Sequence, residues 1–413
     1  MKIKDIEAIE ILDSRGNPTL RTFVTLEDGT VGSSSVPSGA STGVHEAVEL
    51  RDNDLKRYQG KGMYKAINNV NDNISKKIVN VEFNHPEEID SLMINLDGTT
   101  NKVLLGANAI LSVSQAIIRA LSISRKLPLW KFINELYFKE ITPSFPKIMS
   151  NVINGGKHAG WNFDIQEFMI IPQKQLPSES LRIASEIYHS IKKSLKERGL
   201  STLVGDEGGF SPLLNSNEEV FQLIVASADL VGYKNRKEYR LAIDAAATEF
   251  FSDGKYILKK DGREVSGEEL IKYYLDLSNK YQVYSFEDVF AEDDWDNWSK
   301  FKSELNPNDF LIGDDLYCTD TKRMKIGFDK KSTNAVLIKL NQIGSVKETV
   351  EAIKLAKQYG WAVAVSHRSG ETEDSFIADL AYASAADFLK TGAPARSDRV
   401  AKYNRLIEIE SGL

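Results

Sequence analysis

Charged side chains follow a series of short apolar segments in the C-terminal two-thirds of the chain. They are Asp244, Glu287, Asp314, Lys339, His367, Arg368 and Lys390. A single aspartate after a strand is commonly a helix N-cap, but lysine is a poor cap. Several charged residues of both signs, each placed after an apolar segment, therefore indicate one shared site.

Three of these residues are carboxylates that would lie close together: Asp244, Glu287 and Asp314. Such a cluster is costly unless a cation occupies it. The candidate ligands are oxygens and no Cys/His cluster is present, which favours Mg²⁺ first and Mn²⁺ second over zinc. Arg368 beside Ser369 suits a phosphate, which a guanidinium binds with two hydrogen bonds. The sequence thus predicts an anionic substrate bridged to a metal.

Three glycine-rich segments add further candidates. Residues 37–43 do not match a phosphate-binding P-loop, and taken alone they indicate a surface turn. Residues 154–160 contain His158, which lies nine positions before Glu167. Residues 205–209 place Glu207 between glycines, where a carboxylate is not easily buried in a core, and this favours a positioned acid.

The elements that must position these residues alternate after residue 146. Short apolar segments recur, and most are followed by a segment with helical spacing. The apolar segments are 168–171, 241–243, 283–286, 310–312, 335–338, 362–365 and 387–389. Alternating strands and helices predict a parallel sheet, and in a closed barrel the carboxyl ends of the strands meet at one face.

The first part of the chain has a different pattern. The first 30 residues alternate like strands and contain a hairpin signal at Asp28–Gly29, whereas 45–80 and 102–138 show helical spacing. We therefore expect an α/β protein with a small N-terminal α+β domain at residues 1–138 and a barrel domain at residues 143–413.

Net charge, cysteine content and apolar runs exclude some binding partners and indicate a compartment. The chain has 413 residues and a formal net charge of −7, which argues against nucleic acid or an anionic membrane as a partner. Cys318 is the only cysteine, so we expect no disulfide and a reducing compartment. The charged N-terminus lacks the apolar run of a signal peptide, and no stretch approaches about 18 apolar residues. These features predict a cytoplasmic protein.

Several longer motifs resemble those of the enolase family, and the resemblance extends from about Asp13 to Glu410. They include DSRGNPT at 13–19, VPSGASTGVHEA at 36–47, GDEGG at 205–209, IKLNQIG at 338–344, SHRSGETED at 366–374 and KTGAPARS at 390–397. The resemblance implies a small N-terminal α+β domain and an eightfold α/β barrel whose first strands are unusual in order. It also implies reversible dehydration of 2-phosphoglycerate to phosphoenolpyruvate in glycolysis and gluconeogenesis, by a Mg²⁺-dependent carbon–oxygen lyase.

The resemblance implies a set of metal ligands, matched position by position to this sequence. Asp244, Glu287 and Asp314 match the ligands of a first Mg²⁺, and Ser41 matches a residue that helps hold a second Mg²⁺ with the substrate phosphate. A balance of charges agrees with two Mg²⁺ per site, with Mn²⁺ as a substitute.

The resemblance also implies roles for the remaining candidates. Lys339 matches the base that removes the proton at C2, and Glu207 matches the acid that assists loss of the C3 hydroxyl. Lys390 matches the contact to the substrate carboxylate, and Arg368 and Ser369 match the phosphate binders. His158, Glu167 and His367 match pocket residues that close around the substrate.

These roles require shifted pKa values. Lys339 must be neutral to act as a base, and we expect burial and nearby cations to lower its pKa. Glu207 must hold a proton near neutral pH, and we expect desolvation and pairing with Glu167 to raise its pKa.

The sequence departs from the family pattern at a few positions. Val289 stands where proline is expected, and Lys157 and Trp161 are unusual in the segment around His158. The resemblance implies a homodimer or an octamer, and Arg21 and Glu408 exchange the charges usual at two positions of the dimer interface.

Two other functions remain open at this stage. One is an enolase-like paralogue that acts on a phosphonate analogue, suggested by Lys157 and Trp161. The other is a non-enzymatic partner protein with the same fold, which would have no need to keep Lys339, Glu207 and three carboxylates together.

Overall fold

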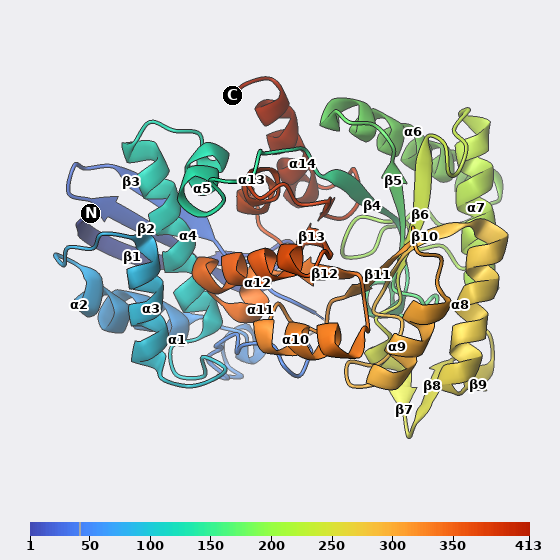
Figure 1. The fold of residues 1–413 in the computed structure, drawn as a ribbon, viewed down its shortest axis with the longest axis horizontal. Coiled ribbons are helices and arrows are strands. Elements are labelled where there is room, and N and C mark those ends of the chain that lie inside the picture. Colours follow the sequence, from blue (N-terminus) through green and yellow to red (C-terminus); the bar gives the residue numbers. More distant parts are fainter. Residues whose placement is uncertain (41–42) are drawn as a thin grey trace.

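The computed structural model describes residues 1–40 and 43–413, so Ser41 lies outside the described residues. Two domains lie side by side, with the N-terminal domain at the left and the barrel at the right of Figure 1. The N-terminal sheet is antiparallel and contains β1 (Ile3–Leu12), β2 (Pro18–Leu26) and β3 (Val31–Ser35). The predicted hairpin at Asp28–Gly29 joins β2 to β3, and Gly29 takes a φ of 85° that favours glycine.

Helices cover one side of this sheet. The helical elements of the domain are η1 (Tyr58–Gly60), α1 (Tyr64–Asn68), η2 (Asn69–Ile74), α2 (Ser75–Ile78), α3 (Pro86–Asp97), α4 (Ala107–Ser124) and α5 (Leu129–Tyr137). Helix α4 packs directly on β3 because Gly32 has no side chain: a Cβ there would lie 2.2 Å from the backbone nitrogen of Ala120.

The helical prediction for 45–80 is only partly correct, because the first half of that segment is irregular. Its backbone bonds to other parts of the molecule instead: Ala47 N–H donates to the carbonyl of Gln342 at 2.7 Å, and Val48 N–H donates to that of Asn101 at 2.8 Å. The segment thus connects the N-terminal domain to the barrel.

One helix among the described residues is long and apolar enough to cross a membrane, by length and composition alone. Helix α4 has the length and composition of a membrane span, but 83% of it is buried inside the protein. Its apolar residues pack on the sheet of the N-terminal domain, as expected for a core helix.

Eight strands close into the barrel of the second domain. They are β4 (Lys147–Asn154), β5 (Glu167–Pro172), β6 (Tyr239–Asp244), β10 (Val283–Glu287), β11 (Phe310–Gly313), β12 (Ala335–Ile338), β13 (Ala362–Ser366) and β14 (Phe388–Lys390). Going round the barrel, their order is β10, β11, β12, β13, β14, β4, β5, β6. The expected eightfold α/β barrel is therefore confirmed.

The predicted parallel arrangement fails at one strand, since β5 is antiparallel to both β4 and β6. The connection from β4 to β5 contains the short turn η3 (Gly156–Ala159) and no crossover helix, so the chain returns as a hairpin. This reversal brings Glu167, the first residue of β5, to the same end of the barrel as Asp244, its partner in the register.

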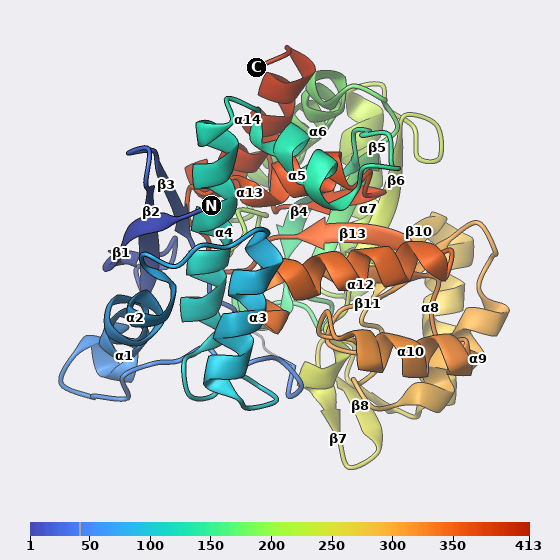
Figure 2. The ribbon, with the colours of Figure 1, turned by 60° about the vertical axis from the view of Figure 1, so that its left-hand side comes forward.

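The remaining elements surround the barrel (Figures 1 and 2). They are α6 (Pro177–Glu197), α7 (Asn217–Leu230), η4 (Ala247–Phe250), β7 (Phe251–Ser252), β8 (Lys255–Leu258), β9 (Arg263–Val265), α8 (Gly267–Tyr281), α9 (Trp295–Glu304), α10 (Thr321–Lys330), α11 (Leu340–Ile343), α12 (Val346–Gln358), α13 (Phe376–Ala383) and α14 (Ser397–Glu410). Apolar residues such as Met169, Leu337 and Phe388 form a buried cluster from the barrel strands. The polar site is therefore confined to the carboxyl end of the barrel.

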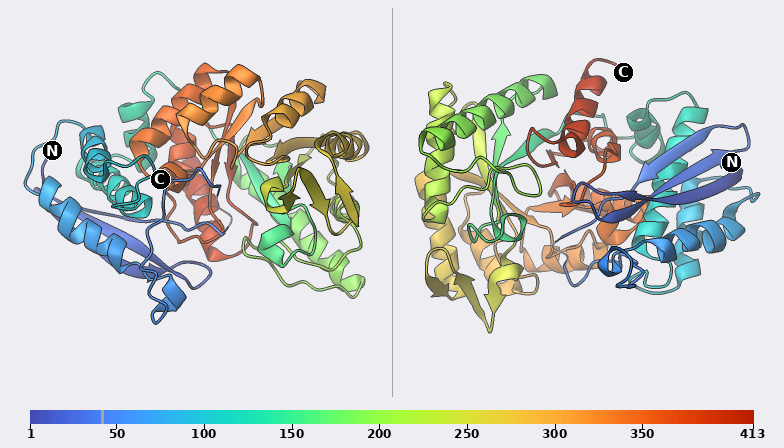
Figure 3. Two further views of the ribbon diagram at one scale, coloured as in Figure 1. Left: turned by 90° about the horizontal axis from the view of Figure 1, so that it is seen from below. Right: turned by 180° about the vertical axis from the view of Figure 1, so that it is seen from behind.

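The N-terminal domain reaches this end of the barrel through its loops, and Figure 3 shows the two domains in contact from below and from behind. Ser38 forms a short antiparallel bridge with Gly370, and Ser14 N–H donates to the carbonyl of Glu371 at 2.7 Å. Both domains thus contribute to the rim of the site.

Candidate active site

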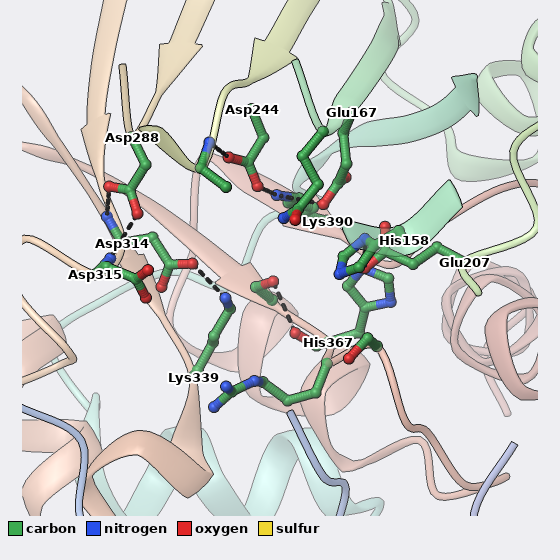
Figure 4. Close-up of a pocket in the computed structure, with 15 residues that line it drawn as sticks. His158, Glu167, Glu207, Asp244, Asp288, Asp314, Asp315, Lys339, His367 and Lys390 are labelled. Atoms are coloured by element: carbon green, nitrogen blue, oxygen red, sulfur yellow. Dashed lines mark hydrogen bonds and ion pairs between the residues drawn. The ribbon is translucent and has the colours of Figure 1, made fainter. Parts of the chain in front are cut away.

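A polar pocket with about 390 Å³ of space opens at the carboxyl end of the barrel (Figure 4). Its lining contains His158, Gln166, Glu167, Glu207, Asp244, Ala246, Asp288, Asp314, Asp315, Lys339, Ser366, His367, Arg368, Ser369 and Lys390. These include all the predicted site residues that the structure describes except Glu287. Glu287 lies directly behind the lining, where its Oε1 accepts a hydrogen bond from Lys390 at 2.7 Å.

One lysine lies among three carboxylates on neighbouring strands. Lys390 Nζ lies 2.7 Å from Glu287, 2.9 Å from Asp244 and 3.2 Å from Glu167. All four side chains are buried. Burial raises the pKa of Glu167 and of Glu287 well above the ordinary value, and carboxylate neighbours contribute to this shift.

This cluster has three carboxyl groups around one lysine, a set of oxygens that suits a divalent cation. Oε2 of Glu287 and Oε2 of Glu167 are buried and have no hydrogen-bond partner among the described residues. Unpaired buried carboxylate oxygens are the donors that a hard cation such as Mg²⁺ prefers. The residues therefore fit the metal that the sequence predicts.

The third predicted ligand, Asp314, lies in a separate ion pair. It bonds to Lys339 Nζ and also accepts a hydrogen bond from Gln342 Nε2 at 2.8 Å. Among the described residues, two groups each contain three potential ligands whose atoms lie within 4.8 Å of one another. Asp314 belongs to one of these groups, with Asp288 and Asp315. Asp244 and Glu287 belong to neither group. In this state Asp244 and Glu287 contact Lys390, whereas Asp314, the third predicted ligand, contacts Lys339.

Asp288 orients the segment that carries Asp314. Its two carboxylate oxygens accept the backbone N–H groups of Asp314 at 2.8 Å and Asp315 at 2.7 Å. Both oxygens are therefore engaged in holding the turn after β11. The sequence analysis missed this role, although Asp288 directly follows Glu287.

The expected pKa of Lys339 is wrong for this state. Burial is the largest single influence and lowers the pKa of its ammonium group, but Asp314 and Glu287 raise it, and on balance the pKa lies above its ordinary value. The nearby cations Arg368 and Lys390 do act in the expected direction and lower it. The sequence shows which charges are present but not that Asp314 is the nearest of them.

Glu207 lies beside one amide donor and two histidine rings. Asn151 Nδ2 donates to its Oε2 at 2.9 Å, while His367 Nε2 and His158 Nδ1 lie 3.4 Å and 3.5 Å from its Oε1. Burial raises the pKa of Glu207, but the two histidines, Arg399 and Lys390 lower it by more, and the pKa lies well below its ordinary value. The expected raised pKa is thus found at Glu167 instead of Glu207.

The two predicted phosphate binders lie where both domains meet. Ser369 Oγ accepts a hydrogen bond from the backbone N–H of Ala40 at 2.7 Å. Arg368 donates to both carboxylate oxygens of Glu46 and to Asn341 Oδ1 at 3.0 Å. The contribution of Glu46 was not predicted, although it lies in the motif at 36–47.

The unusual residues around His158 face away from the pocket lining. Lys157 Nζ lies 3.0 Å from Glu249, and the ring of Trp161, 41% exposed, lies 6.0 Å from Lys259 Nζ. Val289 is completely buried in the apolar core beyond β10. None of these three residues belongs to the pocket lining.

Comparison with known protein families agrees with this architecture. Residues 3–133 match the family described as "Enolase, N-terminal domain", and residues 142–413 match "Enolase, C-terminal TIM barrel domain". The fold and the site therefore define an enzyme of the lyase type built on an enolase-type barrel. The two matches cover nearly the whole chain, and the protein belongs to the enolase family.

Proposed function

We propose that this protein catalyses the reversible dehydration of 2-phosphoglycerate to phosphoenolpyruvate. The observation that carries the proposal is that Lys339 and Glu207 extend into one pocket from different sides (Figure 4), and that carboxylates and Arg368 also line this pocket. A phosphorylated hydroxy acid has a phosphate for Arg368 and Ser369 and a carboxylate for Lys390. Its C2 proton and C3 hydroxyl would then lie between a base and an acid.

The base in this proposal is Lys339. Its high pKa in the present state depends on Asp314. If Asp314 were held as a metal ligand, its charge would no longer favour the ammonium form. Burial, Arg368 and Lys390 each lower the pKa of Lys339, which is the direction that a proton acceptor requires.

The acid in this proposal is Glu207, which works in a coupled pair with Glu167. These two carboxyl groups and His158 have atoms within 4.8 Å of one another, and the charge of Glu207 contributes to the raised pKa of Glu167. Two carboxyl groups this close favour sharing one proton. The raised pKa of Glu167 and the lowered pKa of Glu207 favour the proton at Glu167, and loss of the C3 hydroxyl requires a proton to be available at Glu207.

Asp244, Glu287 and Asp314 would hold Mg²⁺, with Mn²⁺ as a substitute, and a second Mg²⁺ would bind with the substrate phosphate near Ser41. Bound Mg²⁺ supplies positive charge that stabilises the negative charge developing on the substrate carboxylate. The residues of the chain supply the base, the acid and the groups that orient the substrate. We further propose that the protein acts in the cytoplasm as a homodimer or a larger assembly of dimers.

One assay tests this function against the alternatives. The purified chain is mixed with 2-phosphoglycerate, and phosphoenolpyruvate is followed by its ultraviolet absorbance with Mg²⁺ and with a chelator. We expect a rise in absorbance that requires Mg²⁺. Turnover of a phosphonate analogue without turnover of 2-phosphoglycerate would identify a paralogue, and inactivity toward both would indicate a non-enzymatic protein.

A further inference from the structure

Arg399 is completely buried in the first turn of α14, behind the lining of the pocket. Its guanidinium donates to three backbone carbonyls: Arg368 at 2.5 Å, Ser369 at 2.6 Å and Asp206 at 3.2 Å. The first two follow β13, and the third immediately precedes Glu207. One side chain thus joins the loop of the phosphate binders to the loop of the proposed acid.

The same guanidinium also contacts His367, whose Nδ1 lies 2.5 Å from Arg399 Nη1. A guanidinium has donors only, so Nδ1 must accept the hydrogen bond with its lone pair. In a neutral imidazole the proton is then on Nε2. That nitrogen lies 3.4 Å from Glu207 Oε1, so the N–H is on the side of the ring that faces the acid.

The charge around His367 is consistent with a neutral ring. Burial lowers the pKa of His367, Glu207 raises it, and Arg399, Lys390 and Lys339 lower it, so that the pKa lies well below the ordinary value. The charge of Arg399 itself is compensated by Asp398, whose Oδ2 lies 2.8 Å from its Nε. An uncompensated buried guanidinium would be costly, so this arrangement favours a defined role for Arg399.

We propose that Arg399 is a positioning residue of the active site, which fixes His367 in the Nε2–H tautomer directed at Glu207. Through this contact Arg399 determines whether the nitrogen of His367 that faces Glu207 carries a proton. Arg399 itself does not touch the substrate. The tautomer follows from the contacts alone, whereas its effect on turnover rests on the function proposed above.

Nuclear magnetic resonance tests the tautomer directly. The chain has five histidines, so ¹⁵N-histidine labelling gives few signals, and the His367→Gln variant assigns those of His367. In the wild-type protein we expect one tautomer, with Nε2 protonated and Nδ1 unprotonated. A wild-type His367 with a proton on Nδ1 would overturn the proposal before any variant of Arg399 is made.

Variants of Arg399 test its control of the tautomer. Arg399→Met keeps much of the side-chain length but has no donor, and we expect His367 to become a mixture of tautomers. Arg399→Lys keeps a charge and a donor, and we expect partial retention of the Nε2–H form. Arg405→Gln is the matched control, because Arg405 lies on the same helix but pairs with Asp379. A folded Arg399→Met variant with an unchanged single tautomer would overturn the proposal.

Kinetics distinguishes positioning of the acid from support of the phosphate loop. For Arg399→Met and Arg399→Lys we expect kcat to fall about tenfold or more, with a smaller change in the KM for 2-phosphoglycerate. A raised KM with unchanged kcat would show that Arg399 serves only the loop of Arg368 and Ser369, and would overturn the assignment. If Arg399→Met does not fold, the wild-type spectrum and the lysine variant carry the test. If the wild type lacks turnover, the proposed function fails while the spectra still decide the tautomer.

Discussion

Glu46 binds both terminal nitrogens of Arg368, at 2.8 Å for Nη1 and 2.9 Å for Nη2. Both side chains are buried. A guanidinium offers a phosphate the same two-point geometry. The N-terminal domain therefore places a carboxylate where the proposed substrate phosphate must bind.

The first prediction concerns this carboxylate. In Glu46→Gln we expect the KM for 2-phosphoglycerate to fall about threefold or more, because a neutral amide competes less well than a carboxylate for the guanidinium. Inorganic phosphate should inhibit the variant at correspondingly lower concentration. Steady-state kinetics measures both values.

Glu10→Gln is a suitable control for that prediction. Glu10 binds Arg57 through both carboxylate oxygens in the same manner but does not line the pocket. A higher KM in Glu46→Gln than in the control would show that Glu46 holds Arg368 ready for phosphate instead of competing with it.

The second prediction separates the proposed base from the proposed acid. In Lys339→Ala we expect loss of solvent deuterium exchange at C2 of 2-phosphoglycerate, since no group remains to remove the proton. In Glu207→Gln we expect exchange to persist while phosphoenolpyruvate formation falls by about a hundredfold or more. Each variant is the control for the other. Undiminished exchange in Lys339→Ala would remove its assignment as the base.

The alternation of apolar and helical segments was sufficient to predict the barrel, because five of its eight strands end in, or are directly followed by, a charged residue of the site. The pattern fails at β4, where Ser150, Asn151 and Asn154 interrupt the apolar residues. These polar side chains are buried because they have partners inside the protein: Asn151, for example, donates to Glu207. Only the folded structure shows that partner.

Strand-end reasoning also could not place Glu167, which begins its strand. Its position at the pocket depends on the reversal of β5, and the residues of β5 do not themselves indicate a direction. The errors in pKa have a similar origin. The effect of a charge depends on the distance to its neighbours, and the sequence does not show that Lys339 contacts Asp314 while Lys390 contacts Glu287.

The third prediction concerns the lysine inside the carboxylate cluster. In Lys390→Met we expect the affinity for Mn²⁺ without substrate to rise about tenfold or more, because a positive charge close to Asp244 and Glu287 is removed. Electron paramagnetic resonance of free Mn²⁺ measures the affinity independently of activity. Lys402→Met is the matched control, since the buried Lys402 pairs with Glu371 instead. Unchanged affinity would show that these carboxylates do not hold the ion.

The fourth prediction concerns stability at the domain interface, where Figure 2 shows α3 beside α12. Asp90 Oδ2 on α3 accepts hydrogen bonds from Ser114 Oγ and from the backbone N–H of Lys347, both at 2.9 Å. Burial raises the pKa of Asp90 from 3.8 to about 6. The protonated form is thus favoured in the folded state, and its contribution is present below pH 3.8 and lost as the pH rises through about 6.

An amide at position 90 avoids the cost of the buried charge. Since both donors bond to one oxygen, the amide oxygen of Asp90→Asn can accept both. We expect the variant to be more stable than the wild type by about 3 kcal/mol at pH 8 and nearly equal to it below pH 4. Urea unfolding at both pH values measures the difference. A variant that is less stable at pH 8 would show that the N-terminus of α12 favours the charged form of Asp90.

The fifth prediction concerns the proposed homodimer. Within one chain Arg21 pairs with Glu373, and Glu408 lies 3.0 Å from Arg405. Both residues remain partly exposed, and we propose that Arg21 also attracts Glu408 of a second copy. Arg21→Glu and Glu408→Arg should each weaken the dimer, while the double variant should regain affinity through a coupling of about 1 kcal/mol for each contact. Sedimentation at several protein concentrations measures dissociation. Additive effects would reject the contact, and Glu373→Gln controls for loss of the pairing within the chain.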